Sequence, residues 1–170
     1  KFISEHFSNY LKDSVLNVGG GGKKHLAEYL NSKKYIELDI DGDPDILINL
    51  DDEYPIPIED NKYNTVICSD VLEHLEHFHR TFGELIRISN KYIIISLPNS
   101  LPVFYHYLRR KKYAVYDKAG SVNQKHGFYT KYYGLPLSVP EDRHRWFFSY
   151  TEAEKFMKHY SKIFSYKILE

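Results

Sequence analysis

The sequence predicts an α/β fold in three layers, with helices covering both faces of a mostly parallel sheet. Two observations lead to this prediction: strand-like runs alternate with helical patterns over residues 2–97, and those runs are almost continuously apolar. Parallel strands are covered on both faces and therefore lack the polar alternation of a half-exposed strand. Of the 170 residues, 42% are hydrophobic and 27% are charged, which is typical of a globular protein. We therefore expect a single domain over residues 1–170.

The elements follow from apolar periodicity, taken in order along the chain. Ile3, Phe7 and Leu11 share one helical face, which predicts a first helix at 2–12. Apolar runs predict strands at 14–18, 35–39, 45–50, 63–69 and 91–97, and helical patterns lie at 23–31, 76–89 and 151–160. A last run at 164–169 is expected to add one more strand. The region between the fifth strand and the last helix, 101–148, breaks the pattern and is predicted to be an aromatic and basic insert.

Four consecutive glycines, Gly19 to Gly22, follow the first predicted strand. Glycine is needed where the backbone takes a positive φ or where a ligand approaches without a Cβ in the way. A strand that turns through such a loop into a helix presents N–H groups to a nucleotide-like ligand. Asp39 ends the next strand, twenty residues after Gly19, where a carboxylate can accept hydrogen bonds from both ribose hydroxyls. These features predict a nucleoside cofactor pocket; the alternative is a plain glycine turn.

The residues after the glycines argue against two common nucleotides. The motif G-x-G-x-x-G needs a glycine at position 24 or 25, which hold Lys24 and His25. The phosphate-binding motif G-x-x-x-x-G-K-[ST] is absent as well, because Gly22 and Lys23 are followed by Lys24. The sequence therefore does not favour NAD or ATP.

The single cysteine and the apolar runs limit the classes of protein further. One cysteine, Cys68, excludes a disulfide framework and a cysteine-based zinc site, and it fits a reducing cytoplasm. No apolar run approaches ~20 residues, the length that crosses a membrane. We therefore expect a cytoplasmic protein without a membrane span.

Charge is divided unevenly along a chain whose net charge is zero. Thirteen acidic residues and one basic residue lie between Glu37 and Glu76, whereas nine basic and three acidic residues lie between Val103 and Tyr150. This asymmetry indicates that the two stretches face different ligands, although any single charge is more often solvated surface.

Five stretches resemble, in order and spacing, the class I S-adenosylmethionine-dependent methyltransferases of the small-molecule type. They lie at 15–22, 35–40, 49–52, 57–75 and 93–99. The resemblance implies a Rossmann-like sandwich in which Gly19 to Gly21 pass under the methionine part of the cofactor and Asp39 holds its ribose. It also implies that Asp51 or Asp52 reaches the adenine and that Cys68 to Asp70 line the cofactor floor. The implied cofactor-binding residues are Asn17, Gly19, Gly20, Gly21, Asp39, Ile40, Asp51, Asp52, Ser69 and Asp70.

Two positions depart from the family's pattern. The family usually has an acidic residue where Asn17 stands and a small residue where Lys23 stands. The first change weakens the expected contact with the cofactor's amino group, and the second puts a cation beside the pocket.

Methyl transfer from a sulfonium requires mainly that a nucleophile be held in line, and positioning contributes on the order of 7–11 kcal/mol. A hydroxyl acceptor also benefits from a general base, typically worth ~10²–10⁴ in rate. His74 follows the fourth predicted strand, where the family's acceptor site lies, and is the candidate base. The alternative is that Glu73 and His74 only orient the loop.

A metal site is a further hypothesis. Asp70, Glu73 and His74 are spaced i, i+3, i+4, which places them on one face of a helical turn. Two carboxylates and an imidazole suit Mg²⁺ or Mn²⁺. The stretch is similar to the E-x-x-E-H element of small-RNA 2′-O-methyltransferases, in which a later histidine completes the site. His144 occupies a similar place here.

The insert at 101–148 is expected to cover the acceptor side of the pocket. Its basic and aromatic side chains favour an anionic acceptor, through phosphate contacts and stacking. The predicted substrate-binding residues are Arg143, His144, Arg145 and Trp146. We expect a small metabolite, such as a nucleotide-linked sugar or a surface-polysaccharide precursor. The alternatives are a metal-assisted RNA 2′-O-methyltransferase, although no RNA-binding module is attached, and a methyltransferase-like binding protein without catalysis.

Overall fold

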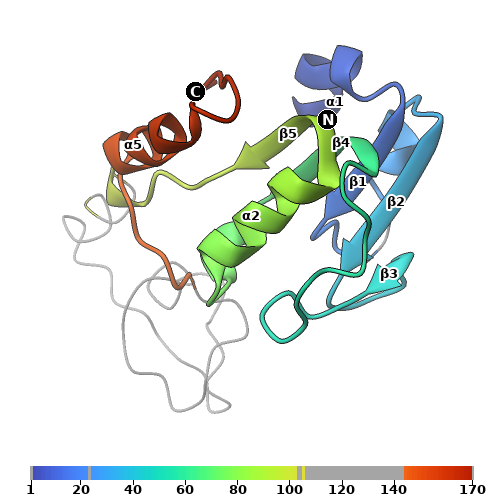
Figure 1. The fold of residues 1–170 in the computed structure, drawn as a ribbon, viewed down its shortest axis with the longest axis horizontal. Helices are drawn as coiled ribbons and strands as arrows, with labels where there is room; N and C mark the ends of the chain where they lie inside the picture. The colour runs from blue at the N-terminus through green and yellow to red at the C-terminus, as the bar shows by residue number, and fades with distance from the viewer. Residues whose placement is uncertain (1, 23, 103–104, 106–143, 170) are drawn as a thin grey trace. The chain divides into compact units, whose positions relative to one another are not determined.

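The computed structural model of the chain describes residues 2–22, 24–102, 105 and 144–169 (Figure 1). The chain forms two compact units, Lys1–Ser96 and Leu97–Glu170. The first unit holds the sheet and the residues predicted to bind a cofactor. Most of the predicted insert at 101–148 lies outside the described residues.

A five-stranded sheet, parallel throughout, forms the centre of the first unit. Its strands are β1 (Ser14–Val18), β2 (Lys34–Asp39), β3 (Ile46–Leu47), β4 (Tyr63–Ser69) and β5 (Ser89–Ser96). They lie in the order β3-β2-β1-β4-β5. This order matches the first five strands of the doubly wound nucleotide-binding fold, which reverses direction between its first and fourth strands. The predicted α/β class with a parallel sheet is confirmed.

Both faces of the sheet are covered, which explains the continuously apolar strands. On one face, Ile3 and Phe7 from the first helical segment pack on a core that contains Val15 and Ile67. Leu16, Val18, Val66 and Cys68 alternate with those residues and point to the other face, and all four are fully buried. The helix α2 (Phe78–Ile88) packs against β4 and β5.

The helix predicted at 23–31 is wrong. Among the described residues of this stretch, 24–31, only a three-residue 3₁₀ turn forms, η2 (Ala27–Tyr29). Gly22 and Lys24 have φ values of 62° and 52°, in the left-handed region, and a right-handed helix cannot begin through them. The predicted helix at 2–12 is also shorter, because α1 (Phe2–Phe7) is followed by the 3₁₀ turn η1 (Ser8–Tyr10).

Two predicted strands differ as well. The run at 45–50 reduces to β3, because Asn49 turns the chain by accepting the N–H of Asp51 on its side chain at 3.0 Å. The run at 164–169 forms no strand in the part of the chain that the structure describes. An apolar run without a neighbouring strand gains no ladder hydrogen bonds and does not order as a strand.

The second unit contains α5 (Tyr150–Tyr160), which confirms the predicted helix at 151–160. Its start is fixed by a capping box, in which the Ser149 hydroxyl accepts the N–H of Glu152 and the Glu152 carboxylate accepts the N–H of Ser149. Among the described residues, no helix is long and apolar enough to cross a membrane.

Candidate functional site

The candidate site lies at the carboxyl edge of the sheet, where β1 and β4 are neighbours but their connections leave in opposite directions. Val18 pairs with Cys68, so Gly19 and Ser69 follow at the same level. Asp39 ends β2, which lies on the other side of β1. In open α/β sheets, ligands bind in the crevice outside this edge, at the point where the strand order reverses. The fold therefore brings the glycine loop and Asp39 together where a ligand is expected.

The glycine loop, defined as Gly19 to Gly22, takes a backbone path that other residues would strain. Gly19, Gly21 and Gly22 have φ values of 73°, 83° and 62°. A Cβ on Gly19 would lie 2.0 Å from Val71 Cγ2, and one on Gly22 would lie 2.3 Å from the carbonyl oxygen of Asp41. A Cβ on Gly21 would meet no atom within 4 Å. The loop is thus packed at Gly19 and Gly22 and open at Gly21.

Asp39 points its carboxylate at the open part of this loop. Its Oδ2 accepts the N–H of Gly21 at 2.7 Å, and its Oδ1 accepts the N–H of Ile40 at 2.7 Å. The residue is 9% exposed, while the side chain of the next residue, Ile40, is 63% exposed. Each carboxylate oxygen can accept more than one hydrogen bond. Asp39 can therefore receive ligand hydroxyls in addition to the backbone donors.

A buried polar network, which was not predicted from the sequence, lies under the glycine loop. Glu37 Oε2 accepts the hydroxyl of Tyr35 at 3.0 Å and the side-chain amide of Asn17 at 3.4 Å. Burial, followed by the hydrogen bond to Glu37, raises the pKa of the Tyr35 hydroxyl well above its usual range. The side-chain amide of Asn17 donates to Tyr35 and to Glu37, and the predicted weak contact of Asn17 with the cofactor's amino group stays a prediction. A signal was present in the sequence, since two polar residues interrupt otherwise apolar strands at paired positions.

The two aspartates predicted to reach the adenine have different surroundings. Asp51 accepts the backbone N–H groups of Glu76 and His77, each at 3.1 Å, and so holds the segment that leads into α2. Asp52 is exposed, and its carboxylate accepts the amide of Asn49. An adenine contact from either residue stays a prediction.

The end of β4 is held by a small hydroxyl cluster. Asp70 has a φ of 55°, an uncommon conformation for a residue with a side chain. Its N–H donates to Ser96 Oγ at 2.9 Å, and the same hydroxyl lies 2.9 Å from Ser69 Oγ. Strained backbone of this kind costs roughly 1–3 kcal/mol and clusters at functional sites. Cys68, the residue before Ser69, is fully buried, and burial raises the pKa of its thiol far above the usual range. The thiol therefore contributes to packing and is not reactive.

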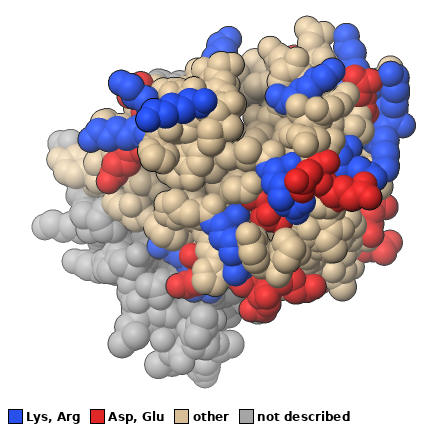
Figure 2. Space-filling model, viewed as in Figure 1, with Lys and Arg blue, Asp and Glu red and all other residues tan. Residues whose placement is uncertain are grey.

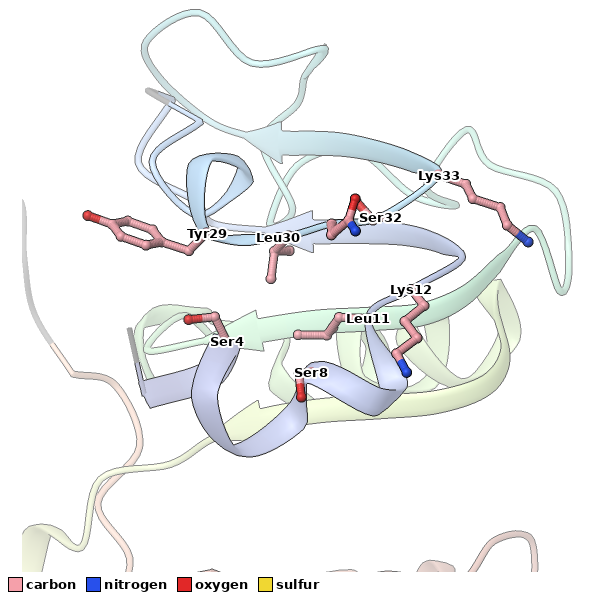
Figure 3. A pocket seen from close by; sticks show the side chains of 9 residues that line it. Ser4, Ser8, Leu11, Lys12, Tyr29, Leu30, Ser32 and Lys33 are labelled. Atoms are coloured by element: carbon pink, nitrogen blue, oxygen red, sulfur yellow. The ribbon is translucent and has the colours of Figure 1, made fainter.

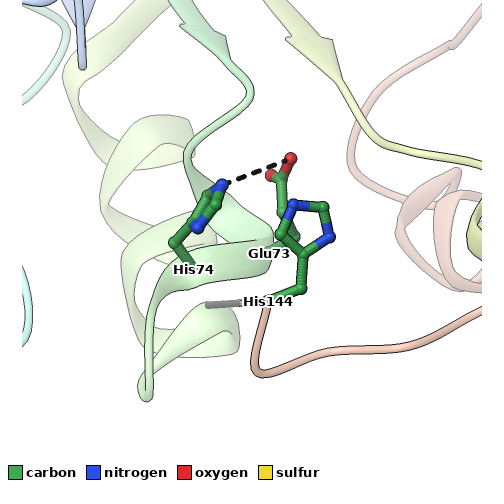
Figure 4. A group of neighbouring side chains, drawn as sticks. All are labelled: Glu73, His74 and His144. Carbon is green, nitrogen blue, oxygen red and sulfur yellow. Dashed lines mark ion pairs between the residues drawn. The ribbon is translucent and has the colours of Figure 1, made fainter. Parts of the chain in front are cut away.

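Glu73 and His74 lie in the 3₁₀ turn η3 (Leu72–His74). His74 Nε2 is 3.9 Å from Glu73 Oε1, with Glu73 buried and His74 partly exposed (Figure 4). The metal hypothesis placed Asp70 on one helical turn with these two residues. That turn is not formed, because the backbone of Asp70 is in the left-handed region and the residue lies outside η3. His144, Arg145 and Trp146 belong to the second unit, and Arg143 lies outside the described residues. The metal and substrate residues therefore stay predictions.

A separate cavity of about 480 Å³ opens on the first unit, away from the glycine loop (Figure 3). It lies between the α1–η1 segment and the residues that precede β2, with Leu11 and Leu30 among its walls and Ser4, Ser8 and Lys12 at its rim. Lys33, also at the rim, is paired with Asp13 at 2.8 Å. None of the predicted site residues lines this cavity.

The acidic stretch between Glu37 and Glu76 belongs wholly to the first unit. Figure 2 shows acidic side chains gathered on the side of that unit which carries β2 and β3, with basic side chains between them. Several of these carboxylates hold the backbone in place, as Asp39, Asp45 and Asp51 do. The stretch is therefore partly structural rather than a single acidic ligand surface.

Comparisons with protein-family models and with curated protein sequences gave no match to this chain. We therefore infer function from the fold and from the geometry of the site.

Proposed function

We propose that the chain binds S-adenosylmethionine at the carboxyl edge of the sheet and transfers its methyl group to an O or N atom of a small anionic acceptor. The observation that carries this proposal is the contact between Asp39 and Gly21, in a sheet whose strand order reverses beside the same loop. A carboxylate that faces a glycine loop at this point suits a ligand with a ribose.

The residues present fit such a cofactor. The open space at Gly21 leaves room for a ligand against the backbone, and the exposed Ile40 offers an apolar surface to a flat base beside Asp39. The cofactor supplies an activated sulfonium methyl group when bound. The protein's own contribution is to hold the acceptor atom in line with that group and to exclude competing water.

His74 is the proposed general base. It follows β4, is partly exposed, and lies beside the buried carboxylate of Glu73. The imidazole of His74 would take the proton of an acceptor hydroxyl held in line with the methyl group, and the adjacent Glu73 carboxylate would favour the resulting imidazolium. In the alternative arrangement, Glu73 and His74 only hold the loop after β4.

Calorimetric titration with S-adenosylmethionine tests the binding site. Asp39→Ala should weaken affinity by about 1–3 kcal/mol, because charged hydrogen bonds are left unmade. Asp13→Ala is the matched control, since Asp13 immediately precedes β1 and so lies at the opposite edge of the sheet. Absence of binding to the unaltered protein would overturn the cofactor, and equal affinity in a folded Asp39→Ala protein would overturn the site.

Methyl uptake by a panel of phosphorylated metabolites tests the reaction. We expect turnover to survive chelation, and His74→Ala to lose more activity than Glu73→Ala. Activity that is abolished by chelation and restored by Mg²⁺ or Mn²⁺ would instead favour the metal-assisted RNA methyltransferase. Cofactor binding without turnover on any acceptor would favour a binding protein. Alanine at Arg143 and Arg145 should raise KM for an anionic acceptor and leave cofactor affinity unchanged.

A further inference from the structure

Glu37 is a carboxylate buried in the middle of β2, and none of its surface is exposed. Burying an ionised carboxylate costs several kcal/mol unless hydrogen bonds compensate it. Three neutral donors meet Glu37: the Tyr35 hydroxyl and the Asn17 amide on Oε2, and the backbone N–H of Lys24 on Oε1 at 3.3 Å. An apolar residue would fill this position at a lower cost, so the importance of Glu37 lies in the groups that it holds.

The groups that Glu37 holds include the backbone of the glycine loop. A Cβ on Gly20 would lie 2.2 Å from Glu37 Oε2 and 2.4 Å from Asn17 Nδ2, so the Gly20 backbone rests directly on the network. The N–H of Lys24, just beyond the loop, donates to the other oxygen of Glu37. Asp39, two residues further along β2 and therefore on the same face, accepts the N–H of Gly21. Two carboxylates of one strand thus hold the loop, one beneath it and one at its open side.

We propose that Glu37 is the positioning residue that fixes the glycine loop for ligand binding. It acts through the loop and not by contact with the ligand, because it is fully buried. The identity of the ligand rests on the proposed function, whereas the control of the loop by Glu37 does not. Asn17 and Glu37 are paired across the ladder between β1 and β2, so the amide and the carboxylate can be exchanged between strands.

An exchange of these two groups tests the proposal. Glu37→Gln places an amide N–H₂ among groups that already donate, and we expect at least about tenfold weaker binding of S-adenosylmethionine. Asn17→Asp places two carboxylates side by side and should weaken binding to a similar extent. The double variant carries one carboxylate and one amide again, and it should return to within about threefold of the original affinity. Tyr35→Phe removes only one donor to Glu37 and should give a smaller loss of cofactor affinity. It replaces Glu37→Gln or Asn17→Asp in the test if either of those variants does not fold.

Glu84→Gln is the matched control, because Glu84 is another buried carboxylate of the first unit, but it bonds to Arg87 and to the N–H of Ile56. It should lower the urea midpoint without changing cofactor affinity. Amide exchange of Gly21 and Lys24 is followed in parallel: it should accelerate in Glu37→Gln and slow again in the double variant.

The outcomes separate the two proposals. The positioning role would be overturned if neither the amide exchange rates of Gly21 and Lys24 nor the cofactor affinity changed in Glu37→Gln. A folded double variant in which neither quantity recovers would overturn it as well. If the unaltered protein does not bind S-adenosylmethionine, the proposed function fails, while the exchange rates still decide whether Glu37 controls the loop.

Discussion

The connection from β4 to β5 contains the 11-residue helix α2, whereas the described residues of the connection from β1 to β2 form no helix beyond the three-residue turn η2. The helix packs against β4 and β5, and its buried apolar residues are Phe78, Phe82, Leu85 and Ile88. In the other connection Leu26 and Leu30 pack on the core, but the backbone of Gly21 and Lys24 is held by hydrogen bonds to the carboxylates of Asp39 and Glu37. Both segments connect parallel strands, but different forces fix their positions.

The difference matters for function. Apolar burial depends on area and tolerates small shifts, whereas a hydrogen bond weakens steeply when its angle and distance change. The proposed binding loop would have to be placed to within a fraction of an ångström, and hydrogen bonds to Glu37 and Asp39 can supply that precision. The apolar connection supplies stability. The following predictions test whether stability and binding divide between the two connections in this way.

The largest effect is expected from Phe82→Ala in α2. Phe82 is almost fully buried, and truncation of a core phenylalanine removes apolar burial and leaves a cavity, at a cost of about 3–5 kcal/mol in unfolding free energy. Urea unfolding measures the loss. Cofactor affinity of the protein that remains folded should not change, and a parallel fall in both quantities would contradict the division between the two connections.

Glycine-to-alanine changes in the two connections should have opposite signs. In Gly20→Ala, the new Cβ meets buried, hydrogen-bonded groups of Glu37 and Asn17, so we expect about 1–3 kcal/mol of destabilisation and weaker cofactor binding. Gly83 is exposed within α2, and a Cβ there meets nothing within 4 Å. Gly83→Ala should therefore stabilise the protein by about 0.5–1 kcal/mol. Thermal unfolding and calorimetry of both variants check this, and the same sign in both would refute it.

A smaller, pH-dependent effect is expected at Glu84. Hydrogen bonds from Arg87 lower the pKa of the Glu84 carboxyl below its ordinary value of 4.5, which outweighs the opposing effect of burial. A carboxyl with a depressed folded-state pKa stabilises the protein above its unfolded pKa, and this stabilisation is lost as the pH falls through the folded value. Glu84→Gln should therefore cost about 1 kcal/mol at pH 7. The difference should shrink below about pH 4.5 in urea titrations, and a constant difference would argue against the ionic origin.

The smallest effect is expected from Asp13→Ala. Asp13 pairs with Lys33 on the surface, where the side chains are 46% and 82% exposed, so solvent screens the pair. Neither the urea midpoint nor the cofactor affinity should change measurably. A clear loss of affinity would show that the amino edge of the sheet contributes to binding.

The sequence predicted those parts of the fold that depend on local pattern. The strands at 14–18 and 63–69 match β1 and β4, since apolar runs of that length have few other ways to be buried. The helix predicted at 23–31 failed because the path of Lys24 is decided by non-local contacts: its N–H bonds to Glu37 and its ammonium to Asp45. Glu37 itself escaped prediction because two of its three donors, the Asn17 amide and the N–H of Lys24, are distant in the chain. The place of Asp39 at the end of β2 was predicted because it is visible locally, whereas its contact with a cofactor stays a prediction.

The N–H of Gly21 donates to Asp39 at 2.7 Å, so the exchange rate of this amide proton should report whether a ligand is bound to the Asp39 carboxylate. A ligand hydroxyl that displaces this N–H from Asp39 Oδ2 releases the proton to exchange faster with solvent, and one that adds beside it slows the exchange. Either change occurs at a single residue with no side chain of its own. Isotope labelling of Gly21 would therefore report, without a dye or an assay substrate, when and how the carboxylate is engaged.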